Sequence, residues 1–248
     1  MKKFFFVLLN FFFVGLYAQN PQANAVIEYK LFQNTTESTY LDTALLVNGF
    51  NTIYVEKFST LKNTDKPDTS SNSSIQDDYI KIDHKQKEIF SFEYLGANMV
   101  IVKDDYVNLN WHITEEAKKI NGYNCLKATA SYRGKNWIAW FTPEIALPYG
   151  PWKLYGLPGL IVEAHDSTDT FVWKIEKIQY QKDPIFNKDF YTLVKTKNKQ
   201  PMSKKQYIHD LDEMEANEDT EHRIATPGMG ETIIVTRGGY ELKYEWEK

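Results

Sequence analysis

Five histidines and one cysteine are the side chains of this 248-residue chain that most readily act as bases, nucleophiles or metal ligands. The histidines are His84, His112, His165, His209 and His222. Carboxylates accompany three of them, as Asp83-His84, His165-Asp166 and His209 with Asp210 and Glu213. None of these groups has the ligand spacing of a recognised metal site. We therefore expect no metal or cofactor, and the cluster from His209 to His222 predicts a solvated helix face followed by a loop.

Nucleophilic catalysis has no sequence motif here. The chain contains no Gly-x-Ser-x-Gly elbow and no His-Glu-x-x-His helix. Cys125 with His112 or His165 could in principle form a thiolate pair. The neighbours of the cysteine, Tyr123 and Leu126, instead predict a strand within the core. We therefore expect a buried, inert thiol, while hydrolysis at a site defined by geometry alone stays open as the alternative.

Aromatic side chains make up 15% of the chain and gather near two proline-containing turns. In the segment 136–141 the strand alternation places Trp137 and Phe141 on one face and Trp140 on the other. One face must be core, and the other is either covered by a second layer or exposed for binding. The candidate ligand-binding residues are Trp140, Tyr149, Trp152 and Tyr155. We expect Trp152 and Tyr155 to lie near the surface, because turn residues flank their segment.

These aromatic residues surround a stretch with unusually consistent turn chemistry, from Gly150 to Ala164. Pro158 presets φ near −65° and Gly159 can adopt positive φ, which predicts a type II turn followed by a short buried strand. The structural motif consists of Gly150, Pro151, Gly156, Leu157, Pro158, Gly159, Leu160 and Ile161.

Residues 156–161, Gly-Leu-Pro-Gly-Leu-Ile, match the hexapeptide after which the GLPGLI family is named, and the chain resembles that family from about Ala25 to Tyr180. Further matching segments are 111–113, 119–129, 132–135 and 139–141. The chain differs at His112, Lys135 and Ala146, where the family tends to carry lysine, arginine and proline. The resemblance implies an exported bacterial envelope protein of unassigned function.

The N-terminus predicts export. Lys2-Lys3, an apolar run from Phe4 to Leu16 and a small residue at Ala18 are typical of a signal peptide over residues 1–18, which leaves one β-rich domain at 19–248. The run is shorter than the about 20 residues that span a bilayer, so we expect no membrane-spanning segment and a periplasmic or secreted protein. The formal charge of −4 excludes nucleic acid as a favoured partner, since phosphate binding needs clustered basic residues. With one cysteine, no intramolecular disulfide is possible.

Alternating apolar residues predict an antiparallel sheet. The expected strands are 26–32, 52–59, 79–83, 89–94, 99–102, 107–113, 125–132, 136–141, 160–164, 170–179, 232–235 and 240–246. Two turns, Asn121-Gly122 and Arg133-Gly134, predict hairpins. The polar segment 60–78 predicts a loop, as does 219–230. Ser203 predicts the cap of a helix, with Gln206 returning a capping-box bond and Met202 and Tyr207 as its hydrophobic staple.

The pattern predicts a mainly β fold: a strongly curved antiparallel sheet, similar to a half-open barrel of the lipoprotein-carrier type, with one helix near the C-terminus. A closed β-sandwich is the alternative. For function we favour a non-catalytic envelope protein that binds an apolar or peptide ligand, or an envelope partner. A hydrolase of the esterase or peptidase type is the alternative.

Overall fold

Twelve strands form one continuous sheet in the computed structural model, which describes residues 23–35, 38–56, 79–185, 200–225 and 237–247. The strands are β1 (Asn24–Gln33), β2 (Thr39–Asn48), β3 (Asn51–Val55), β4 (Tyr79–Asp83), β5 (Glu88–Leu95), β6 (Asn98–Asp104), β7 (His112–Ile120), β8 (Tyr123–Tyr132), β9 (Lys135–Thr142), β10 (Leu160–Asp166), β11 (Phe171–Gln181) and β12 (Met202–Ser203). The signal peptide, the loop at 60–78 and the strand at 232–235 that the sequence predicts lie outside the described residues.

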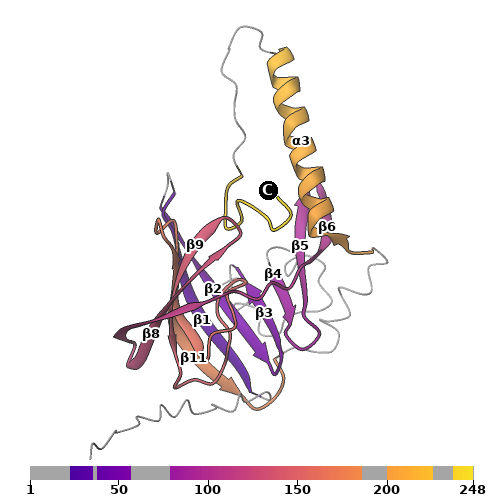
Figure 1. The fold of residues 1–248 in the computed structure, drawn as a ribbon. Coiled ribbons are helices and arrows are strands. Elements are labelled where there is room, and N and C mark those ends of the chain that lie inside the picture. Colours follow the sequence, from indigo (N-terminus) through magenta and orange to yellow (C-terminus); the bar gives the residue numbers. More distant parts are fainter. Residues whose placement is uncertain (1–22, 36–37, 57–78, 186–199, 226–236, 248) are drawn as a thin grey trace, which may run out of the picture.

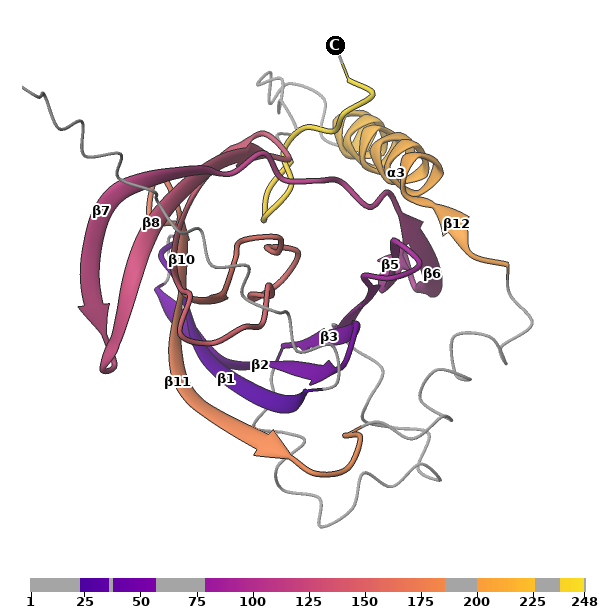
Figure 2. The ribbon, with the colours of Figure 1, turned by 60° about the horizontal axis from the view of Figure 1, so that its bottom comes forward.

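The sheet curls into a half-open barrel, which confirms the predicted fold (Figure 2). Its order is β12-β6-β5-β4-β3-β2-β1-β11-β10-β9-β8-β7, and every pair is antiparallel except the short β12 beside β6. Register shifts interrupt β1 after Glu28, β7 after Ile113 and β10 after Ile161. Such irregularities bend a strand and increase its twist, so they help the sheet to curl.

The concave side of the sheet is filled by the chain between β9 and β10. Figure 2 shows this segment, residues 143–159, inside the curve of the sheet. All five residues from Pro151 to Tyr155 are buried. The segment is tied to a distant part of the chain, because Tyr149 donates a hydrogen bond to the carbonyl of Gly49, in the β2–β3 turn, at 2.9 Å. Just after the segment, the Ile161 carbonyl accepts a hydrogen bond from Tyr29 of β1 at 2.7 Å. The segment therefore fills the barrel. Tyr149 and Trp152 belong to the main core cluster, and Tyr155 packs in a smaller cluster with Ile82 and Ile89.

The turn at Pro158 differs from the predicted type II turn. The Gly159 amide donates to the Leu157 carbonyl at 2.8 Å, which is a three-residue γ-turn centred on Pro158, while the Leu160 amide bonds to Ile145. Gly159 does have positive φ, as predicted, at 157°. Glycine is required there mainly by space: a Cβ atom would lie 2.1 Å from the Thr142 carbonyl oxygen.

One helix follows the sheet, α3 (Lys204–Ala225), and Figure 1 shows it extending beyond the ends of β5 and β6. The Ser203 hydroxyl accepts a hydrogen bond from the Gln206 amide at 3.2 Å, which confirms the predicted cap. The capping box is wrong, since the Gln206 side chain bonds to Asp210 instead. In the part of the chain described, no helix is both long enough and apolar enough to cross a membrane.

Three other predictions of local structure are wrong. The chain at 107–111 is irregular, and β7 begins only at His112. The segment 240–246 forms turns rather than a closing strand, and the helix continues through 219–225, where a loop was predicted. Strand β2 has no counterpart among the predicted strands.

Candidate functional site

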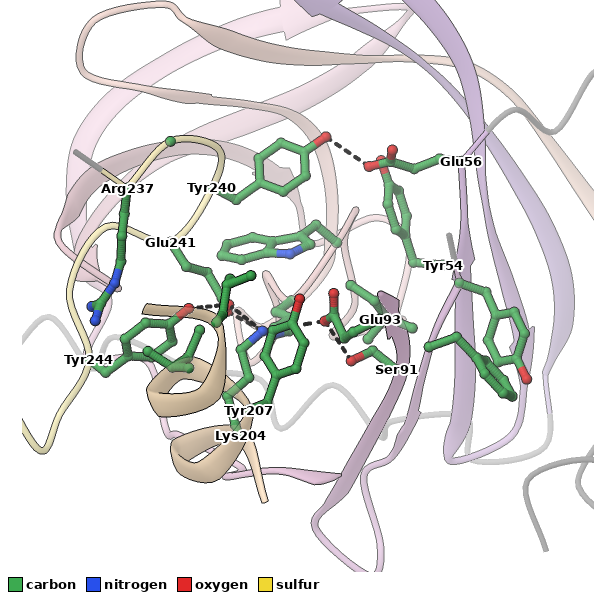
Figure 3. A pocket seen from close by; sticks show the side chains of 18 of the residues that line it. Tyr54, Glu56, Ser91, Glu93, Lys204, Tyr207, Arg237, Tyr240, Glu241 and Tyr244 are labelled. Carbon is green, nitrogen blue, oxygen red and sulfur yellow. Dashed lines mark hydrogen bonds and ion pairs between the residues drawn. The ribbon is translucent and has the colours of Figure 1, made fainter. Parts of the chain in front are cut away.

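A cavity of about 360 Å³ lies on the concave side of the barrel, where the sheet, helix α3 and the C-terminal segment 237–247 meet (Figure 3). Strands β3, β4 and β5 form one wall through residues such as Tyr54 and Phe92. Trp152 and Lys153 come from the segment inside the barrel, and Lys204 and Tyr207 from the first turn of α3. The volume falls within the range of small-molecule sites.

Trp152 forms the aromatic part of this cavity in a backbone conformation that is rare for a bulky side chain. Its φ is 54°, in the left-handed region, which costs on the order of 1–3 kcal/mol. The indole is held by rings on several sides, with centroids 5.3 Å from Trp137, 5.6 Å from Tyr132 and 5.4 Å from Tyr240. Strain that the surrounding packing maintains is typical of functional sites.

Charged groups form the adjacent part of the cavity. The Lys153 ammonium lies 2.6 Å from Asp104 Oδ2 and 2.6 Å from Glu241 Oε1, although the lysine is only 2% exposed. Glu241 also pairs with Lys204, at 3.1 Å from its Oε2, and Arg133 pairs with Asp104 at 2.8 Å. The five side chains come from five separate parts of the chain. Buried charges of this kind are stable only when paired, because transfer from water is costly.

The ion pairs decide the charge states of the cluster. Burial alone lowers the pKa of Lys153, but Glu241 and Asp104 overcome this and hold it well above its usual value. Burial alone would raise the pKa of Glu241. The positive charges of Lys153, Lys204 and Arg133 have a larger, opposite effect, so the pKa of Glu241 lies well below its usual value. Both groups are therefore ionised across the physiological pH range.

Arg133 and the neighbouring Tyr132 keep unused hydrogen-bonding capacity. The Tyr132 hydroxyl and Arg133 Nη1 are buried without a hydrogen-bond partner among the described residues, and Arg133 Nε forms no hydrogen bond although it lies 3.4 Å from Glu245 Oε1. Burial raises the pKa of Tyr132 to about 12, so its hydroxyl stays protonated. Unsatisfied buried polar atoms are uncommon in native proteins, so these donors require a structural or functional explanation.

The four predicted ligand-binding residues do not form one surface. Trp152 and Tyr155 are 3% and 4% exposed, so their predicted position near the surface is wrong. Tyr149 is equally buried, and only Trp152 lines the cavity. Trp140 lies on the opposite face of β9 from the core, half-buried, with the Lys118 ammonium 4.1 Å from its ring centroid. Turn residues at both ends of the segment with Trp152 and Tyr155 predicted a surface loop, but the curled sheet encloses this segment.

Tyr149 and Tyr155 instead surround His84. The His84 ring stacks on Tyr149 at 4.5 Å between centroids, and its two nitrogens lie 3.1 Å from the Thr52 hydroxyl and 3.0 Å from the Tyr106 hydroxyl. Burial lowers the pKa of His84 to about 4, while Asp83 raises it slightly. His84 is thus a half-buried, neutral imidazole whose two nitrogens are both engaged, which indicates a structural role.

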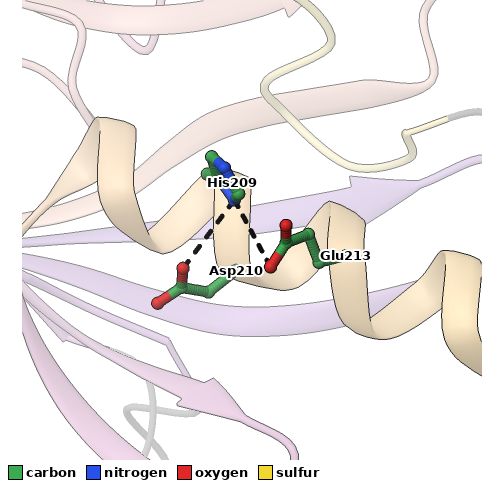
Figure 4. A group of neighbouring side chains, drawn as sticks. All are labelled: His209, Asp210 and Glu213. Atoms are coloured by element: carbon green, nitrogen blue, oxygen red, sulfur yellow. Dashed lines mark ion pairs between the residues drawn. The ribbon is translucent and has the colours of Figure 1, made fainter.

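Three other histidines, His112, His165 and His209, do not line the cavity. His209 lies 3.9 Å from Asp210 Oδ1 and 3.7 Å from Glu213 Oε2 on exposed turns of α3 (Figure 4). The His209 and Glu213 side chains are 59% and 68% exposed, as expected for a solvated helix face. His112 is exposed at the start of β7, and His165 contacts Asp169 in the β10–β11 turn. His222 lies in the part of α3 whose side chains are outside the described residues.

Cys125 is buried, as predicted from its neighbours, and its thiol contacts the Tyr123 carbonyl at 3.4 Å. Burial raises its pKa, which lowers the fraction of reactive thiolate. We expect a maleimide at neutral pH to modify the native thiol at least about a hundredfold more slowly than the denatured one. Labelling of native protein at the denatured rate would contradict this prediction, and mass spectrometry after timed quenching measures both rates.

Sequence reasoning missed the charged cluster. Lys153 stands between Trp152 and Leu154 in a run that must be buried, and a lysine there requires a buried partner. That signal identifies the lysine but not the partner, because Asp104 lies 49 residues before it and Glu241 lies 88 residues after it.

Comparison with known families gives one match, which covers residues 27–208. The family is described as "N-glycanase peptide, N-terminal domain". No curated protein matches the chain.

Among solved structures, PNGF-II is similar in fold. Its C2 crystal form gives a TM-score of 0.55 at 20% identity over 76% of this chain and 32% of that chain. The P21 form gives 0.53 at 18% identity over 76% and 33%. A LolA superfamily protein from Nitrosomonas europaea gives 0.30 at 9% identity over 69% of this chain and 92% of that chain. The match with PNGF-II therefore spans about a third of the length of that protein.

Proposed function

Because this chain belongs to the family described as "N-glycanase peptide, N-terminal domain", we propose that it is a non-catalytic binding domain of the bacterial cell envelope. Its ligand is an apolar molecule or a peptide, held in the cavity on the concave side of the sheet. The observation that carries this proposal is the cavity of about 360 Å³ beside the strained Trp152. The two lysines that line this cavity, Lys153 and Lys204, both form ion pairs.

The charge states of Glu241 and Lys153 remove two catalytic roles from the cavity and so favour binding. A general acid needs a carboxyl group with a raised pKa, and Glu241 has the opposite. A lysine nucleophile must lose its proton near neutral pH, and the pKa of Lys153 is raised. The aromatic rings of Trp152, Tyr240 and Tyr54 offer rigid contact area for a ligand.

The family description also favours a second candidate, hydrolysis of a glycosylated substrate. The family model describes an N-terminal domain, and the match spans only about a third of PNGF-II, so we assign that activity to this chain only as the alternative. Incubation of the purified chain with an N-glycosylated peptide, followed by mass spectrometry, distinguishes the two. Turnover that is lost in Glu241→Gln would replace the binding proposal.

Two features of the sequence complete the proposal. The charged start and apolar run of residues 1–18 support export, and the segment 156–161 supports a place among GLPGLI proteins. Intact-mass analysis of protein from the envelope tests the first, with cleavage after Ala18 as the expected result.

The binding proposal is tested with N-phenyl-1-naphthylamine, a neutral aromatic probe whose fluorescence rises in apolar surroundings. We expect saturable binding of one probe per chain. Leu211, on α3, lines the cavity and is half-buried, so Leu211→Trp should fill the space and weaken binding about tenfold. Glu213→Trp adds the same ring to an exposed position of the same helix and should leave binding unchanged. Equal binding by both variants, with native near-ultraviolet circular dichroism, would place the probe elsewhere.

A further inference from the structure

The carboxylate of Glu241 is held in the manner of a bound anion. Its Oε1 accepts from the Lys153 ammonium at 2.6 Å, and its Oε2 from the Lys204 ammonium at 3.1 Å and the Tyr244 hydroxyl at 3.2 Å. Figure 3 shows Glu241, Lys204 and Tyr244 converging on one side of the cavity. Charged donors on both oxygens of one carboxylate are typical of a strong anion site.

The cations around Glu241 depend on the C-terminal segment for part of their charge balance. Without Glu241 and Glu245, which both belong to that segment, Arg133, Lys153 and Lys204 face two carboxylates, because Asp104 pairs with Arg133 and Lys153 while Glu93 lies 3.3 Å from Lys204. Glu245 pairs with Arg133 at 3.4 Å. An unmatched positive charge in a buried site requires an anion.

Two other charged residues of the cavity do not change this balance. Glu56 lies across the cavity, where it accepts a hydrogen bond from the Tyr240 hydroxyl at 2.8 Å. Arg237 adds no free positive charge, because its guanidinium pairs with Asp212 and Glu247. Without Glu241 and Glu245, the unmatched positive charge lies among Arg133, Lys153 and Lys204.

The segment that carries Glu241 lies against the sheet without joining it. Residues 237–247 contain no strand or helix, and Figure 2 shows them crossing the open side of the barrel. Their backbone hydrogen bonds to the rest of the described chain both go to the Arg133 carbonyl, from Leu242 at 2.8 Å and from Lys243 at 3.3 Å. The sheet therefore does not need this segment for its own pairing.

We propose that Lys153 and Lys204 form a binding site for an oxyanion, and that Glu241 occupies it as an internal substitute for the anionic group of a ligand. The inference rests on the proposed binding function and adds the ligand class: an apolar molecule or peptide that bears a carboxylate, sulfonate or phosphate. The Tyr132 hydroxyl and Arg133 Nη1, which have no hydrogen-bond partner among the described residues, offer further donors beside the site. Entry of the ligand displaces Glu241 and the segment around it.

The test compares two probes that differ by one sulfonate: neutral N-phenyl-1-naphthylamine and anionic 1-anilinonaphthalene-8-sulfonate. In Glu241→Gln the sulfonate probe should bind about tenfold more tightly than in the native chain, while affinity for the neutral probe stays unchanged. Adding Lys204→Met to this variant should abolish the gain. Lys205→Met, at the exposed neighbouring position, and Glu245→Gln are the matched controls.

A second measurement does not depend on any variant folding. In the native chain, saturating sulfonate probe should increase hydrogen exchange in peptides from residues 238–247, and the neutral probe should not. The anion site would be overturned if the sulfonate probe left hydrogen exchange in residues 238–247 unchanged. It would also be overturned if Glu241→Gln changed the affinities for the two probes by the same factor. If only the neutral probe binds to the native chain and its variants, the anion site fails alone. If neither binds, the binding function fails with it.

Discussion

Gly159→Val is expected to destabilise the protein by about 4 kcal/mol or more, enough to leave most of a marginally stable chain unfolded. The added Cβ atom would lie 2.1 Å from the Thr142 carbonyl oxygen and 2.7 Å from its carbonyl carbon. Both atoms are backbone, and Thr142 pairs with Leu160 in the β9–β10 ladder, so relief requires moving a strand. Urea unfolding, or the yield of soluble protein, measures the effect.

Gly156 provides the control for this substitution. It also has positive φ, at 93°, but a Cβ atom there meets nothing within 4 Å. Gly156→Ala should therefore cost only about 1 kcal/mol, which is the conformational penalty without a steric clash. If the two variants were equally stable, the close approach of Gly159 to Thr142 would not determine the packing of this turn.

The sequence predicts the hairpins well because their turns are local. Asn121-Gly122 and Arg133-Gly134 all have positive φ, as a tight two-residue turn requires. Strand β7 shows the limit of the method. Most of its residues are exposed and several are Glu or Lys, so it lacks the alternation that identifies a strand. β7 extends to Ile120 because β8 supplies its hydrogen-bonding partners. The preferences of single residues for strands do not include this pairing.

The candidate site is less predictable than the fold because its parts meet only after the sheet curls. Trp152 could be singled out from composition, but its burial depends on the enclosure of residues 143–159 by strands far away in sequence. Lys153 receives its two carboxylates from the end of β6 and from the C-terminal segment. Local pattern contains no information about such distant pairs.

Lys153→Met should be nearly as damaging as the glycine substitution, with an expected loss of about 3–5 kcal/mol. The change keeps an apolar side chain of similar length but removes the charge that faces Asp104 and Glu241, both at 2.6 Å. Glu241 is then left in a mostly buried position with Lys204 as its nearest cation. Lys103→Met is the matched control, because Lys103 pairs with Glu88 at 2.8 Å in an exposed position and should contribute at most about 1 kcal/mol.

The pH dependence of stability identifies the reason for this loss. In the native chain, Lys153, Lys204 and Arg133 lower the pKa of Glu241 despite its burial. As the pH falls below the ordinary glutamate pKa of about 4.3, the unfolded state therefore binds a proton at Glu241 before the native state does. The stability that Glu241 contributes is thus present above that pH and is lost as the pH falls further. Lys153→Met raises the native pKa of Glu241 and should flatten the stability profile below about pH 4.3. Parallel acid profiles for the native chain and the variant would show that Lys153 acts through packing rather than charge.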